Sequence, residues 1–308
     1  ARRAPAVPTG QPPQATTPDP PRAGRSLDGA TYIRPRAVKP CMQLRRLLRG
    51  RVEWSRLEAV AREIRERYGR EEVTVRFLDA DNWLSTPMVV DDRWFVKVIS
   101  KRNSVVHALF TTGRNLGAFS SGTEGFFEHF ATPVEMAEHE LEATTRMREV
   151  GLNAPEPVEA FEVDGLGVVV LEYLPEFRTL DELDTASEAD LAPAVFEALR
   201  RMHEHDLLHG DLRAENVLIR DGEIYFIDAT SVTDGKASDA ESYDVACALG
   251  ALEPLIGGKR TVDAALAAFS SEELLAAARF LDFVNIRPDH DFDAAVLHGE
   301  IEKRASSP

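Results

Sequence analysis

The spacing of apolar residues changes along the chain and predicts where helices and strands lie. Between positions 52 and 68 the apolar residues recur at helical intervals, and Gly69 can end that helix. Three short apolar runs typical of strands come next, at 73–78, 87–90 and 94–99. A helical pattern then opens at Pro133 and ends at Gly151.

The second half of the chain repeats this alternation once and then becomes helical. Two strand-like runs, 158–163 and 168–173, are joined by a hairpin turn at Asp164-Gly165. From Leu180 onward the pattern is mainly helical, and one small hairpin interrupts it at 217–227. The order predicts an α+β fold with two lobes, in which a small β-rich N-lobe with one helix precedes a mainly helical C-lobe.

Two stretches show neither the helical spacing nor the strand-like runs of apolar residues. Residues 1–41 hold nine of the 18 prolines and seven basic but only two acidic side chains, so we expect a disordered tail. Residues 101–131 combine four glycines with five phenylalanines, and they interrupt the N-lobe as an insertion. We expect this insertion to be a mobile element that docks over the cleft; a static patch on the small lobe is the alternative.

Composition narrows the class of protein further. The 44% of hydrophobic residues supports a packed core, whereas no run approaches the 18 apolar residues of a membrane span. Cys41 and Cys247 fit no disulfide framework, which favours a reducing cytoplasm. The net charge of −16, with only six lysines among 36 basic residues, suits a halophilic cytoplasm or an acidic protein of a GC-rich genome. Either origin argues against direct nucleic-acid binding.

The strongest chemical signal is the segment 209–219, which reads HGDLRAENVLI. A hairpin and an apolar run ending at Asp228 follow it. We interpret Asp211 as the base that accepts a proton from an attacking hydroxyl, and Asn216 and Asp228 as ligands of Mg²⁺ that bridges the phosphates of ATP. A solvated loop with chance acidic residues is the alternative, but three elements in register oppose it.

Lys97 lies in an otherwise apolar strand, where a cation needs a phosphate or carboxylate partner. The helix that opens at Pro133 offers several glutamates. Glu140 shares a face with apolar residues of that helix, so we predict that it pairs with Lys97, with Glu138 as the second choice.

The remaining nucleotide contacts are predicted from the ends of strands. In a kinase-like arrangement the strand ending near Glu172 would lead to a hinge, and the backbone at Glu172 and Leu174 would bond adenine. No G-x-G-x-x-G occurs in the loop 79–87, where Ser85 and Thr86 are candidates for phosphate contact. A simple turn that ends at Pro87 explains this loop equally well.

These motifs resemble the RIO family of atypical protein kinases and, more distantly, the aminoglycoside-phosphotransferase-like kinases. Gly210 replaces the arginine of eukaryotic-type protein kinases, and the interval from Asp228 to Asp244 is too short for a long activation segment. The insertion 101–131 is similar to the flexible loop of RIO kinases. The resemblance covers roughly 73–255 and implies a bilobal protein-kinase-like fold.

The resemblance also implies roles for further residues. Asp244 would anchor the catalytic loop, His209 would support it, and Arg213 would contact the transferred phosphate, which favours a protein hydroxyl as acceptor. The function implied is an ATP- and Mg²⁺-dependent atypical serine/threonine protein kinase or regulatory ATPase. A ribosomal association would follow from the family alone.

Two other functions stay open. A small-molecule phosphotransferase would need an acidic acceptor pocket, for which the helical tail offers several aspartates (Asp282, Asp289, Asp291, Asp293). A non-catalytic nucleotide-binding scaffold would explain the missing glycine loop, although the full catalytic set opposes it. We divide the chain into a tail at 1–41, a helical extension at 42–69, an N-lobe at 70–173 and a C-lobe at 174–308.

Overall fold

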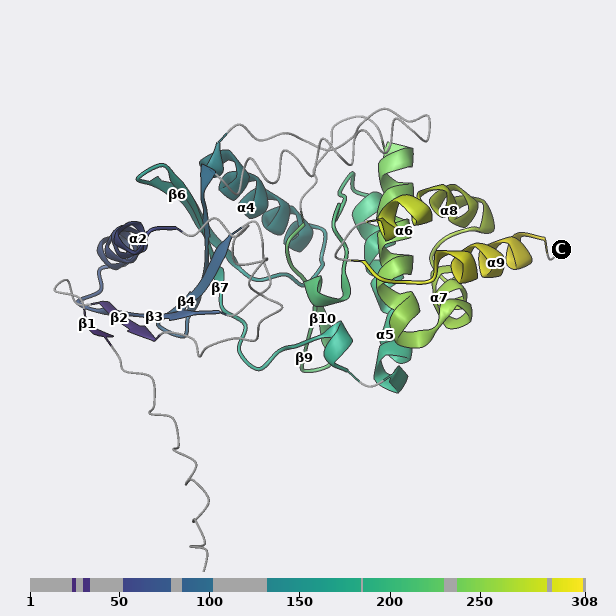
Figure 1. Cartoon of the computed structure of the whole chain (residues 1–308), viewed down its shortest axis with the longest axis horizontal. Helices are drawn as coiled ribbons and strands as arrows, with labels where there is room; N and C mark the ends of the chain where they lie inside the picture. Colours follow the sequence, from purple (N-terminus) through teal and green to yellow (C-terminus); the bar gives the residue numbers. More distant parts are fainter. Residues whose placement is uncertain are drawn as a thin grey trace, which may run out of the picture.

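The computed structural model describes residues 24–25, 30–33, 52–78, 85–101, 132–183, 185–229, 237–286 and 290–306. A seven-stranded sheet with two helices forms one lobe, and a bundle of helices with a three-stranded sheet forms the other (Figure 1). The predicted α+β fold, with a β-rich N-lobe and a mainly helical C-lobe, is confirmed. The predicted insertion 101–131 lies outside the described residues apart from Lys101, and so does the loop 79–84.

The core of the N-lobe sheet is a set of five antiparallel strands in the spatial order β3-β4-β5-β7-β6. Their bounds are Val73–Phe77 (β3), Thr86–Val90 (β4), Trp94–Ile99 (β5), Pro157–Val163 (β6) and Leu166–Glu172 (β7). Each lies within two residues of the strand predicted from the sequence. β5 and β7 are neighbours, so the strand of Lys97 pairs with the strand that leads to the predicted hinge.

Two short strands extend this sheet from the N-terminal stretch. β1 (Gly24–Arg25) pairs with β2 (Ala30–Ile33), and β2 pairs in parallel with β3. These strands differ from the expectation that all of 1–41 is disordered. The sequence ATYI of β2 is rich in strand-forming residues, and an unpaired sheet edge offers it backbone hydrogen bonds.

Helices cover both faces of the sheet. β7 alternates between them: Val168 and Val170 pack in a cluster with α2 (Trp54–Arg67), whereas Val169 and Leu171 pack with α4 (Pro133–Glu149). A strand that is buried on both faces reads as a continuous apolar run, which explains why β7 shows no polar alternation.

The start of α4 is fixed tightly against the sheet. Thr132 and Glu135 form a reciprocal capping box at its first turn. Opposite this turn, a Cβ placed on Gly167 of β7 would lie 1.9 Å from the carbonyl oxygen of Pro133. Only glycine allows this approach, so the position of α4 relative to the sheet depends on Gly167.

The C-lobe is built around α6, which is buried over most of its length. The other helices pack around it, and their bounds are Thr185–His203 (α5), Ala237–Ile256 (α6), Gly258–Ala265 (α7), Ser271–Asn285 (α8) and Ala294–Ala305 (α9). A three-stranded sheet faces the N-lobe, formed by Arg178–Thr179 (β8), Val217–Arg220 (β9) and Glu223–Phe226 (β10). Among the helices of the described ranges, none is long and apolar enough to cross a membrane.

Candidate active site

A buried lysine joins the two lobes. Lys97 Nζ lies 2.8 Å from Oε1 of Glu140 and 2.7 Å from Oδ1 of Asp228, and its side chain is only 6% exposed. Lys97 pairs with Val169 in the sheet and therefore points to the same face, which is the face covered by α4. The strand, the helix and the segment after β10 each supply one member of this Lys97–Glu140–Asp228 triad.

The helix α4 presents Glu140 to the lysine because of its apolar stripe. Met136, Ala143 and Met147 are buried, and Glu140 lies on that side of the helix with a side chain that is 13% exposed. Glu138, the second choice from the sequence, is exposed. The structure therefore brings Glu140 to Lys97 and leaves Glu138 outside the triad.

The charges of the triad do not balance. Burial disfavours the ammonium form of Lys97, but the adjacent Asp228 and Glu140 carboxylates outweigh burial and hold the pKa of Lys97 above its usual value. Burial raises the pKa of Glu140, the nearby Asp228 raises it further, and Lys97 opposes both. Two carboxylates share one ammonium, so the site can accept additional positive charge.

A buried carboxylate of the C-lobe holds the backbone of the loop at residues 209–210. Asp244 of α6 is fully buried and accepts hydrogen bonds from the backbone N–H groups of His209 at 2.6 Å and Gly210 at 2.7 Å. Gly210 has a φ of +74°, a left-handed conformation that favours glycine. His203 at the end of α5 adds a contact to Asp244, at 3.4 Å from Nε2 to Oδ2.

The predicted metal ligands are tied together through the backbone. Asn216 Nδ2 donates to the carbonyl oxygen of Asp211 at 2.9 Å, and the carbonyl of Asn216 accepts from the N–H of Ile227 at 3.1 Å. The next residue, Asp228, has a φ of +61°, a left-handed conformation that is uncommon for residues other than glycine but that aspartate tolerates better than most. The two short segments thus bring Asp211, Asn216 and Asp228 to one region.

His209 is a supporting residue in the structure. Its ring is fully buried and meets the ring of Phe226 edge-on at 6.2 Å between centroids. Burial lowers the pKa of His209, although nearby carboxylates, with Asp244 first, act in the opposite direction. A neutral imidazole therefore fills the space beneath the loop.

Mg²⁺ fits the donor set at this site. Within the described residues no cluster of three or more His, Cys, Asp or Glu side chains suits a metal ion. Mg²⁺ in phosphoryl-transfer sites needs only one or two carboxylates, because substrate phosphates and water complete its shell. Asp228 with the amide oxygen of Asn216 meets that need, and the excess negative charge of the triad favours a cation.

The other predicted nucleotide contacts lie near the ends of two strands of the N-lobe sheet, Ser85 and Thr86 at the start of β4 and Glu172 and Leu174 at the end of β7. Ser85 is buried, and its Oγ has no hydrogen-bond partner within the described residues, while Thr86 begins β4 and is half-buried. Glu172 ends β7, and its carboxylate accepts from the N–H of Glu156 at 3.2 Å. Leu174 follows and is buried. A role for these four residues in binding ATP stays a prediction.

Three contacts in or beside the loop were not predicted from the sequence: two made by Arg213, and the contact of His203 with Asp244. Arg213 Nε lies 3.4 Å from Oδ2 of Asp211, and its guanidinium also contacts the carboxylate of Glu215. His203 reads from the sequence as one more core position of α5, because it follows the apolar stripe there. The sequence places Glu215 two residues after Arg213, but only the turn Ala214–Asn216 brings the two side chains into contact.

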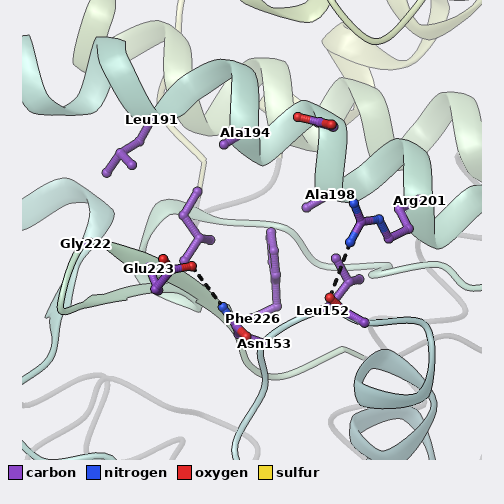
Figure 2. A pocket seen from close by; sticks show the side chains of 12 residues that line it. Leu152, Asn153, Leu191, Ala194, Ala198, Arg201, Gly222, Glu223 and Phe226 are labelled. Carbon is purple, nitrogen blue, oxygen red and sulfur yellow. Dashed lines mark hydrogen bonds between the residues drawn. The ribbon is translucent and has the colours of Figure 1, made fainter.

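A separate cavity of about 300 Å³ lies between the two segments 151–153 and 222–226 and the helix α5 (Figure 2). It opens between α5, the loop after α4 and the hairpin β9–β10, because α5 carries the small residues Ala194 and Ala198 on this face. Asn153 spans the gap: its carbonyl accepts from the N–H of Phe226 at 3.0 Å, and its side chain contacts Glu223 at 3.5 Å. The cavity is thus joined to the strand that leads to Asp228.

Comparison with known proteins gives matches to the part of the chain that holds the predicted site. Residues 128–247 match the RIO domain family. The chain is 33% identical to the KEOPS complex subunit Bud32 of Pyrococcus abyssi over 87 residues, which are 27% of this chain and 38% of that protein. It is 28% identical to the RIO-type serine/threonine-protein kinase Rio1 of Haloferax volcanii over 102 residues, 32% of this chain and 34% of the relative.

Solved structures give weaker likenesses. Aminoglycoside-3'-phosphotransferase of type VIII superposes with a TM-score of 0.47 and 19% identity, over 75% of this chain and all of the other. The aligned segments span little more than a third of the curated relatives named above. Across residues 128–247, however, the resemblance to the RIO family that the motif 209–219 indicated is confirmed.

Proposed function

We propose that the chain transfers the γ-phosphoryl group of ATP to a hydroxyl group, with Mg²⁺ as cofactor. The observation that carries the proposal is the buried Lys97, held 2.8 Å from Glu140 and 2.7 Å from Asp228 across the two lobes. A lysine with a helix glutamate and an aspartate beside a H-G-D-x-x-x-x-N loop has the arrangement that phosphoryl transfer requires.

Each residue has a distinct task in the proposed reaction. Lys97 binds the ATP phosphates and remains charged because its pKa is raised. Asp211 accepts the proton of the acceptor hydroxyl while a new O–P bond forms and the bond to ADP breaks. Asn216 and Asp228 would hold Mg²⁺, which neutralises charge that develops on the phosphate oxygens.

The proposed acceptor is a serine or threonine hydroxyl of a protein, with water as the acceptor in a regulatory ATPase cycle. Arg213, two residues after Asp211, supports this choice, because a guanidinium can bind the transferred phosphate through two parallel N–H···O hydrogen bonds. The small-molecule alternative has less support. Asp293 is one of the aspartates that could form its acidic acceptor pocket, but its Oδ1 caps α9 by accepting from the N–H of Val296 at 3.0 Å.

We propose that the protein works in a complex with other proteins of a reducing, high-salt cytoplasm. One relative is named as a subunit of the KEOPS complex, and a second is named as a probable bifunctional tRNA threonylcarbamoyladenosine biosynthesis protein. The net charge of −16 opposes direct contact with nucleic acid, so any RNA substrate would be held by a partner. Ribosomal association rests on family resemblance alone.

A labelled-ATP assay with single variants tests the proposal. The protein is incubated with Mg²⁺ and γ-labelled ATP in high salt, alone and with protein acceptors, and both ADP and protein-bound phosphate are measured. We expect Asp211→Asn to abolish transfer while the exposed Asp221→Asn on the β9–β10 turn leaves it unchanged. Full transfer by Asp211→Asn would show that the base is assigned wrongly.

A further inference from the structure

The guanidinium of Arg213 lies between two carboxylates of its own loop. Its Nε is 3.4 Å from Oδ2 of Asp211, and its Nη1 contacts Oε1 of Glu215. The turn Ala214–Asn216 makes this possible, because the N–H of Asn216 donates to the carbonyl of Arg213 at 3.0 Å and folds the chain back. Glu215 is thereby brought beside a residue only two positions earlier.

The two contacts differ in strength and in exposure. A charge-assisted hydrogen bond between nitrogen and oxygen measures about 2.7–2.9 Å, so the 3.4 Å contact with Asp211 is a loose one. The contact with Glu215 is the closer of the two. The Asp211 side chain is 13% exposed and the Glu215 side chain 52%, so Glu215 holds Arg213 from the solvent side.

We propose that Glu215 is a positioning residue that holds Arg213 in place for phosphoryl transfer, an inference that rests on the proposed function. Arginine has a long side chain that loses considerable rotamer freedom when it is ordered. Glu215 orders it before substrate arrives and keeps the planar guanidinium turned toward Asp211. The group that must stabilise the transferred phosphate therefore needs no reorganisation during the reaction.

The inference also explains why two acidic side chains flank one arginine here. If Asp211 alone held the guanidinium, the proposed base would be occupied by its own neighbour. Glu215 shares the cation, so Asp211 is not the only carboxylate that the guanidinium contacts. Glu215 itself needs no contact with ATP or acceptor, which distinguishes it from the catalytic residues.

The test combines Glu215→Gln, Glu215→Asp and the control Asp221→Asn, whose carboxylate is also exposed on this lobe. We expect Glu215→Gln to lower kcat on the order of tenfold, as misplacement of a catalytic group does, with KM for ATP unchanged. Glu215→Asp should recover part of the loss. In an Arg213→Gln background, Glu215→Gln should have no further effect, because the residue it positions is gone.

A second readout does not depend on turnover. NMR of the ¹⁵N-arginine-labelled protein reports solvent exchange of the Arg213 Nε–H, identified by its loss in Arg213→Lys. Faster exchange in Glu215→Gln, but not in Asp221→Asn, shows that Glu215 holds Arg213, and this result is obtained even if ATP turnover is absent and the proposed function fails. Unchanged exchange, or an equal kcat loss with and without Arg213, overturns it.

Discussion

Lys97 is the residue on which the site depends most. Removing its ammonium leaves Glu140 and Asp228 side by side in a poorly solvated place, and loss of one partner from a buried ion pair costs about 3–5 kcal/mol. Protonation of Glu140, whose pKa is already raised by burial, would relieve part of that cost. Both the stability of the folded protein and the proposed contact with the ATP phosphates therefore depend on Lys97.

We predict that Lys97→Met lowers the free energy of unfolding by about 2–4 kcal/mol at neutral pH, because two carboxylates lose their shared cation. Urea unfolding measures the change. The matched control is Lys101→Met, since Lys101 is exposed just beyond the same strand and should tolerate the change. Equal stability of the two variants would contradict the ion-pair account.

His209 gives the molecule a predictable response to acid. Its pKa is lowered in the folded state by burial, whereas the unfolded chain takes up a proton near the ordinary value of 6.5. A lowered folded-state pKa means that the contribution of His209 is present above pH 6.5 and is lost as the pH falls toward the folded-state pKa.

We therefore expect the free energy of unfolding to fall between pH 7.5 and pH 5.5, and to fall less in His209→Gln. Urea titrations at both values measure the difference. The exposed His205→Gln should behave as the unmodified protein does. A pH dependence in His209→Gln equal to that of the original chain would show that another group is responsible.

At the scale of elements, apolar periodicity was enough to predict the core strands and α4 within a few residues. The pairing of Lys97 with Glu140 could be predicted because the stripe of Met136, Ala143 and Met147 leaves one glutamate facing inward. The strand β2 could not be predicted, because its residues pair with residues of β3 that are 43 positions away and no local pattern identifies an open sheet edge. The Arg213–Glu215 contact depends on the turn geometry.

The junction of α4 with β7 yields the next prediction. Gly167→Ala would place a Cβ 1.9 Å from the carbonyl oxygen of Pro133, so α4 must shift and carry Glu140 away from Lys97. We expect a loss of about 1–3 kcal/mol in the free energy of unfolding, the usual cost of overpacking, together with weaker ATP binding.

Thermal unfolding and nucleotide titration measure both effects of Gly167→Ala. Gly299→Ala in α9 is the matched control, because no atom lies within 4 Å of its added Cβ and alanine favours helices. That control should be as stable as the original chain or more so. Full stability and full ATP binding by Gly167→Ala would contradict the close approach.

At the scale of the whole molecule, charge and lobe arrangement act together. A net charge of −16 destabilises the compact state through self-repulsion, which salt screens over a Debye length of about 3 Å at 1 M. We predict that the urea midpoint rises between 0.1 M and 2 M KCl. A midpoint that is flat or falls with salt would contradict adaptation to high salt.

The two lobes meet at the Lys97–Asp228 contact, so binding of nucleotide and metal depends on residues of both lobes. Calorimetric titration with ATP, with and without Mg²⁺, measures it most directly. We expect Mg²⁺-dependent binding that weakens at least about tenfold in Asp228→Asn, which loses a ligand charge, and stays nearly intact in Asp211→Asn, whose carboxylate acts on the acceptor. Binding that is absent, independent of Mg²⁺, or equal in Asp228→Asn and the original chain would contradict the proposed site.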